Sequence, residues 1–98
     1  MEYFVFAIRD FKTGFLTPTV EVNAASAIRN FEHAVLGHED SLFFSHPEDY
    51  SLFELGTYDT DTGIMESNGL PTELLSAVEV ISQARIEAAR KAGVQHDG

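Results

Sequence analysis

The sequence predicts a small α+β domain in which an antiparallel sheet packs against one helix and a second helix lies at the C-terminus. Residues 2–9 and 50–58 alternate as strands do, and residues 24–36 carry apolar side chains at helical spacing. A chain of 98 residues, 44% of them hydrophobic, buries roughly 60 to 65% of its unfolded surface, which suits one core. We therefore expect a single domain over residues 1–98, with the order strand, strand, helix, strand, strand, helix.

The first two strands are expected to form a hairpin. The strand over residues 2–9 is apolar on both faces, with Phe4, Phe6 and Ile8 on one side and Tyr3, Val5 and Ala7 on the other. The turn "DFKTG" ends in Gly14 and leads to a returning strand over residues 15–22. Because Pro18 has no N–H to donate, this strand is expected at an edge or broken by a bulge.

The helix over residues 24–36 has signals at both ends. Asn23 occupies the N-cap position, and Gly37 suits the C′ position that follows a helix. Residues 38–49 lack periodicity and are expected to be irregular, with Pro47 to Asp49 forming a turn or a short helical opening.

The remainder of the chain is expected to hold a strand, a hairpin and a helix. Residues 50–58 form the strand, and "DTDTG" turns it into a short strand over residues 63–66. The sheet and the first helix are expected within residues 1–66. The C-terminal helical region follows over residues 67–93, and the helix itself is expected at residues 72–92. Its alanine-rich second half is expected to project or to pack on a partner chain. Residues 94–98 form a polar tail.

The negative charge is concentrated in one third of the chain. Residues 38–66 carry eight carboxylates and no lysine or arginine, so they hold −8 of the net charge of −10. The outer thirds are nearly neutral and remain able to present a locally basic face.

Known catalytic and metal-binding patterns are not matched. Cysteine is absent, which excludes a thiolate nucleophile or a thiolate zinc site. "DTDTG" resembles the start of a calcium loop, but Gly69 stands where the distal glutamate belongs. We expect the four histidines to lie on the surface. No catalytic residue, metal or cofactor is therefore expected, and a metal-dependent enzyme is the weakest alternative.

One segment combines cations with aromatic rings. "RDFKTGF", residues 9–15, interleaves Arg9 and Lys12 with Phe11 and Phe15. Proteins that bind single-stranded nucleic acid stack bases on aromatic rings while cations follow the backbone. We therefore expect Arg9, Lys12 and Arg29 to contact phosphates, and Phe11 or Phe15 to stack on bases. Core packing is expected to claim most other rings, Phe53 among them.

The stretch "HPEDYSLFELGTYDTDTG", residues 46–63, resembles a block in the small non-structural proteins of gokushovirus-type microviruses. "FAIRDFKTGFLTP" and "ASAIRNFEHAV" precede it in the order seen in that family. The resemblance covers roughly residues 3–66. It implies a non-catalytic phage protein that binds single-stranded DNA during progeny-strand synthesis or packaging.

The expected partners follow from these patterns. Single-stranded DNA is first, and viral replication or capsid proteins are further candidates. The second apolar face of the first strand predicts a homodimer or a docked second helix over that face. No segment approaches the roughly 20 apolar residues that span a bilayer, so we expect a protein of the host cell cytoplasm. The alternative is an acidic adaptor whose residues 38–66 engage a basic host or viral protein.

Overall fold

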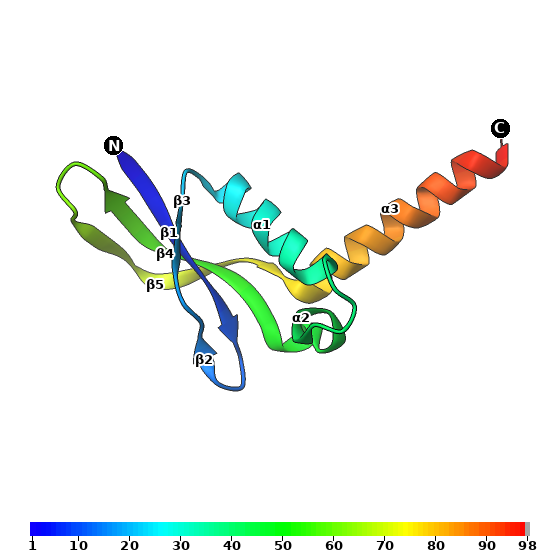
Figure 1. Cartoon of the computed structure of the whole chain (residues 1–98), viewed down its shortest axis with the longest axis horizontal. Helices are drawn as coiled ribbons and strands as arrows, with labels where there is room; N and C mark the ends of the chain where they lie inside the picture. The colour runs from blue at the N-terminus through cyan, green and yellow to red at the C-terminus, as the bar shows by residue number, and fades with distance from the viewer. Residues whose placement is uncertain (98) are drawn as a thin grey trace.

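The computed structural model describes residues 1–97, with side chains described for residues 1–93. It confirms the α+β class (Figure 1). The strands are β1 (Glu2–Asp10), β2 (Gly14–Phe15), β3 (Thr19–Glu21), β4 (Tyr50–Asp59) and β5 (Met65–Ser76). The helices are α1 (Ala24–Leu36), α2 (Leu42–Ser45), the 3₁₀ turn η1 (Pro47–Asp49) and α3 (Ala77–Asp97).

The sheet is antiparallel and has the order β2-β1-β4-β5, with β3 also paired to β1. The predicted strand over residues 15–22 is split as Pro18 suggests: Arg9 pairs with Phe15 and Phe6 pairs with Thr19, and the proline lies between these two pairings. The edge of the sheet beside β1 therefore consists of two short strands.

Helix α1 has the predicted bounds, and its N-cap is formed as expected. The backbone N–H of Ser26 donates to Asn23 Oδ1 at 2.8 Å. Gly37 is the C-cap, but its φ of −68° is right-handed rather than the left-handed C′ conformation that its identity suggested. Within the segment expected to be irregular, the Ser41 hydroxyl caps α2, and Pro47 opens η1 as predicted.

The predicted end of the sheet and start of the last helix were wrong. The short strand expected at residues 63–66 is β5, which continues to Ser76, and the helix starts at Ala77 rather than at residue 72. A capping box sets this boundary: the N–H of Glu79 donates to Ser76 Oγ at 3.1 Å, and Glu79 Oε1 accepts from the N–H of Ser76 at 3.2 Å. Residues 72 and 73 instead pair with β4.

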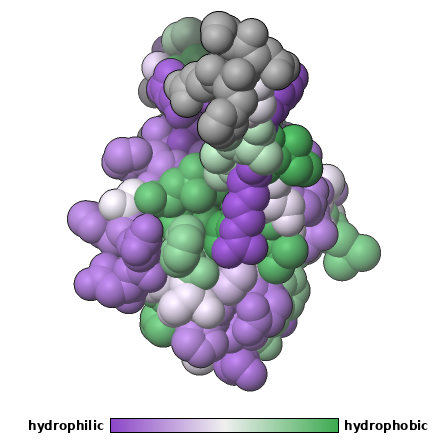
Figure 2. All heavy atoms as spheres, turned by 90° about the vertical axis from the view of Figure 1, so that its right-hand side faces the viewer, coloured by the Kyte–Doolittle hydropathy of each residue, from purple (hydrophilic) through white to green (hydrophobic). Residues whose placement is uncertain are grey.

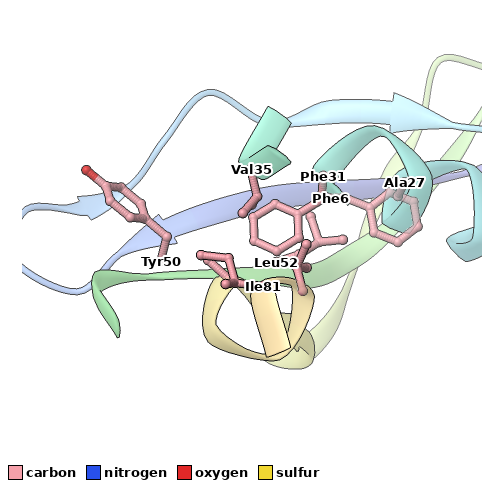
Figure 3. Packing of buried hydrophobic residues seen from close by; sticks show 9 residues of the cluster. Phe6, Ala27, Phe31, Val35, Tyr50, Leu52 and Ile81 are labelled. Atoms are coloured by element: carbon pink, nitrogen blue, oxygen red, sulfur yellow. The ribbon is translucent and has the colours of Figure 1, made fainter. Parts of the chain in front are cut away.

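The core lies between the sheet, α1 and the first turns of α3 (Figure 3). Its members share nearly complete burial and come from distant parts of the chain: Phe6, Ala27, Phe31, Val35, Tyr50, Leu52, Ala77, Val80 and Ile81. Because α1 and the start of α3 meet in this one cluster, both helices cover the same face of the sheet. A second helix docked on the other face, one of the two predicted arrangements, is therefore not present in the described chain.

Helix α3 runs away from this core (Figure 1). Residues 85–93 are exposed throughout, and the molecule measures 56 × 31 × 21 Å along its principal axes. The predicted projection of the alanine-rich half is thus present. Figure 2 views the molecule from this end and shows hydrophobic patches interrupted by hydrophilic residues. The homodimer stays a prediction, since the structure is that of a single chain.

Tyr50 offers a pH-dependent test of the core. Burial raises the pKa of its hydroxyl above 10, and the nearby carboxylates Asp10 and Asp49 add to the shift. The folded state then keeps a proton that the unfolded state releases, so stability is complete below pH 10 and falls as pH rises through the folded pKa. We expect the alkaline loss of stability to shrink in Tyr50→Phe, measured by denaturant titrations between pH 8 and 11. An equal loss in both proteins would contradict this assignment.

Candidate nucleic-acid interface

The β1–β2 hairpin presents the segment in which cations and rings interleave. Its turn is held by Asp10, whose Oδ1 accepts from the N–H of Lys12 at 2.9 Å and whose carbonyl accepts from the N–H of Thr13 at 3.1 Å. Gly14 adopts a φ of 124°, which L side chains rarely allow. The N–H of Phe11 donates to the carbonyl of Asp49 at 2.8 Å, which ties the hairpin to η1. The turn is therefore fixed locally and anchored to the domain.

An arginine and three rings gather beside this turn and define the aromatic cluster: Arg9, Phe11, Phe15 and Phe53. The Arg9 guanidinium carbon lies 5.0 Å from the Phe15 ring centroid and 5.6 Å from that of Phe11, within the range of cation–π attraction. Phe53 meets both rings edge to face, at 5.4 Å from Phe15 and 6.3 Å from Phe11. The cluster thus holds its rings and its cation in a defined arrangement.

The cluster lies on the face of the sheet opposite α1. Arg9 pairs directly with Phe15, and Phe53 pairs with Ala7. Successive side chains of a strand point to opposite faces, and the adjacent Ile8 and Leu52 point into the helical core. The prediction that Phe53 belongs to this core was therefore wrong. The sequence did carry a signal for this: Leu52 and Phe53 are neighbours on one strand, so only one of them can face the core.

The rings are accessible enough to meet a ligand. Phe11 is 48% exposed and Phe15 is 40% exposed, whereas Phe53 is half-buried beneath them. A base can stack only on a ring that is exposed. A ring that its neighbours already hold in place also loses little freedom when the base binds.

The five residues predicted from the sequence divide into two groups. The structure brings Arg9, Phe11 and Phe15 together and leaves Lys12 exposed in the adjoining turn. Arg29 is exposed on α1, and α1 covers the opposite face of the sheet. Arg29 is therefore separate from the aromatic cluster.

The acidic segment, residues 38–66, includes β4 and the chain at both of its ends. Four of its carboxylates precede β4, Glu54 lies within the strand, and the other three lie at or beyond its far end, about 30 Å along the strand. At the far end, Asp59 and Asp61 lie 3.5 and 2.6 Å from the Met1 ammonium. The pKa of Asp59 lies below its usual value. The larger cause is a hydrogen bond that its carboxylate accepts from the N–H of Asp61, and the smaller is the positive charge of the Met1 ammonium.

Two further observations concern the described residues as a whole. No three histidine or carboxylate side chains among them come close enough together to hold a metal ion. In the same part of the chain, no helix is both long enough and apolar enough to cross a membrane.

Comparison with known proteins adds the family. A sequence model of the family described as phage ORF5 protein matches residues 3–80. The chain belongs to the phage ORF5 protein family. No curated protein and no solved structure matches it.

The ORF5 match confirms the bacteriophage part of the resemblance found in the sequence. It includes the hairpin, α1, β4 and β5, and it ends within the first turns of α3. The aromatic cluster of this ORF5-family protein therefore lies inside the matched region, whereas the projecting part of α3 lies outside it.

Proposed function

We propose that this phage protein binds single-stranded DNA with little sequence preference and acts in viral single-strand synthesis or genome packaging, as its resemblance to gokushovirus-type proteins implies. The observation that carries the proposal is the aromatic cluster. Arg9 lies against two exposed rings on a sheet face that α1 leaves open. Such a surface stacks bases of any identity, because every base has a π face.

Stacking, rather than charge, has to supply most of the affinity. The chain carries a net charge of −10, and only Arg9 and Lys12 lie at the hairpin. Glu73 pairs with Phe53 across β4 and β5, which adds a carboxylate near the rings. Each stacked base contributes about 1 to 3 kcal/mol. Two phosphate contacts predict a slope of only about −1.4 in log affinity against log salt.

A salt series with labelled oligonucleotides tests this assignment. We expect binding at low salt with a shallow slope, and weaker binding with a still smaller slope in the Arg9→Ala, Lys12→Ala double variant. The matched control is Arg90→Ala, Lys91→Ala, which removes the same charge from the exposed part of α3. Absence of binding at low salt, or equal loss in both double variants, would rule out the hairpin as the DNA-binding element.

The acidic adaptor is the competing proposal, and the neutralisation of four carboxylates separates it from DNA binding. The variant carries Asn or Gln at Glu48, Asp49, Asp59 and Asp61. An adaptor would lose its basic partner, whereas a DNA binder would keep or gain affinity because repulsion of phosphates decreases. Glu48 and Asp49 precede β4, whereas Asp59 and Asp61 lie at its other end, about 30 Å along the strand. A single basic partner would therefore have to be long enough to contact both pairs.

A homodimer would compete with DNA if the second copy covered the aromatic cluster. A partner seated over Phe15 and Phe53 would bury the proposed base platforms. The mass of the assembly, measured with and without single-stranded DNA, distinguishes the arrangements. A dimer that dissociates on adding DNA shares this face with the nucleic acid, and a dimer that persists uses another surface.

A further inference from the structure

A cavity of about 230 Å³ lies on the other side of the sheet edge, between α1, β1 and the segment that joins β2 to β3. It lies where the edge strand is interrupted, since β2 ends at Phe15 and β3 begins at Thr19. The N–H of Leu16 still donates to the carbonyl of Ile8 at 2.8 Å, so the ladder continues one residue beyond β2. Apolar side chains form its inner surface: Ile8, Leu16, Phe31 and Leu52. The volume is many times that needed for one water molecule, and the apolar lining suits a flat ring.

A polar pair, the exposed Asn30 and the half-buried Glu21, contributes to the lining of the cavity. Asn30 Nδ2 donates to Glu21 Oε1 at 3.0 Å, and both residues line the cavity. A carboxylate only accepts hydrogen bonds, so the amide nitrogen of Asn30 must face it. The second N–H of Asn30 and the second oxygen of Glu21 are then left for another partner. The wall therefore offers a donor beside a charged acceptor.

We propose that this cavity binds a guanine base. The Watson–Crick edge of guanine carries two adjacent donors, N1–H and N2–H₂, beside the acceptor O6. The Glu21 carboxylate would accept from both donors, with Oε1 shared between the base and Asn30, while the second N–H of Asn30 donates to O6. Thymine has one donor between two carbonyl oxygens, and these would face the carboxylate unfavourably. Adenine and cytosine each present a single amino group next to a ring acceptor.

Arg29 precedes Asn30 on α1 and is exposed, but it does not line the cavity. Successive side chains of a helix are about 100° apart, so Arg29 points away from the face that carries Ala27, Asn30 and Phe31. The guanine in the cavity can belong to a free nucleotide or to single-stranded DNA. Binding of a guanine within DNA rests on the proposed function, whereas binding of a free nucleotide does not.

Two ligands separate these sources. The first ligand is a thymidine oligonucleotide with one central guanine, and its affinity is compared with that of the same oligonucleotide without the guanine. The second ligand is guanosine monophosphate. We expect the single guanine to raise affinity about 5- to 150-fold, the range for a well-formed base contact. This preference concerns the one base held in the cavity, and the bases stacked on the aromatic cluster remain of any identity. Glu21→Gln and Asn30→Ala should remove this gain while leaving thymidine binding in place. Glu32→Gln, an exposed residue of α1, removes the same charge as Glu21→Gln and should keep the gain.

The outcomes distinguish the cavity from the aromatic cluster. Equal affinity for both oligonucleotides, with no NMR shift on adding guanosine monophosphate, overturns the guanine site and leaves single-strand binding intact. If no oligonucleotide binds but guanosine monophosphate shifts the NMR signals of Asn30 and Ala27, the cavity takes the free nucleotide and the proposed function fails. If neither ligand shows a guanine effect, the cavity proposal is wrong.

Discussion

Replacing Phe6 with alanine is expected to cost about 3 to 5 kcal/mol of unfolding free energy. Phe6 is fully buried and sits in the cluster that joins β1, β4, α1 and α3. The unfolding free energy of a domain of this size is about 5 to 15 kcal/mol in total. A loss of about 3 kcal/mol or more should lower the melting temperature by at least about 12 °C. Denaturant titration and thermal melting both measure the change.

The control for Phe6→Ala is Leu42→Ala on α2. Leu42 is 61% exposed, so its truncation should change the unfolding free energy by no more than about 0.5 kcal/mol. If Phe6→Ala instead lowered the unfolding free energy as little as this control, Phe6 would not hold the two helices on the sheet. The position of α1 behind the aromatic cluster would then be wrong.

Truncating both exposed rings of the hairpin should nearly abolish single-strand binding. Phe11→Ala, Phe15→Ala removes two base platforms worth about 1 to 3 kcal/mol each, so affinity should fall at least 30-fold. Because both rings are partly exposed, a folded variant should still be recovered, and a melt of the free variant confirms this. Oligonucleotide titration at low salt gives the affinity.

Ring chemistry distinguishes stacking from simple apolar contact at this position. Phe15→Trp retains a π face and should bind at least as well as the original protein, whereas Phe15→Leu retains apolar area without a ring and should bind weakly. Equal affinities for the leucine and tryptophan variants would show that stacking on Phe15 does not hold the DNA.

The elements with local signals were predictable from the sequence. The bounds of α1 follow from an N-cap and a helical apolar pattern within a few residues of each other, so no distant contact was needed. The split of the second strand follows equally from Pro18. The α3 boundary had a local signal as well: Ser76 and Glu79 form a capping box, but the spacing of Leu74, Leu75 and Val78 also fits a helix.

The length of β5 depended on tertiary pairing rather than on local sequence. Between the pairings Glu54 with Thr72 and Gly56 with Ser67, β5 contains extra residues that bulge out of the ladder. Gly69 takes a φ of 90° within this bulge. A strand interrupted in this way has no regular alternation, so its pattern resembled a turn followed by a helix.

The candidate site was predictable only where its residues are neighbours in the chain. Arg9, Phe11 and Phe15 meet because one short hairpin joins them. Phe53 joins them through the pairing of β1 with β4, which brings together residues more than forty positions apart. Arg29 separates from them because α1 crosses the other face. Strand pairing therefore decided the position of Phe53, which the sequence reasoning assigned to the core, and helix placement decided the position of Arg29, whose contact with phosphate stays a prediction.

Photocrosslinking to single-stranded DNA tests the central claim most directly. An oligonucleotide carrying bromodeoxyuridine is irradiated with the protein at low salt, and the attached residues are located by mass spectrometry. The open sheet face predicts crosslinks at Phe11, Phe15 and Phe53. Binding accompanied by crosslinks confined to α3 or to residues 38–49 would contradict this assignment of the nucleic-acid interface.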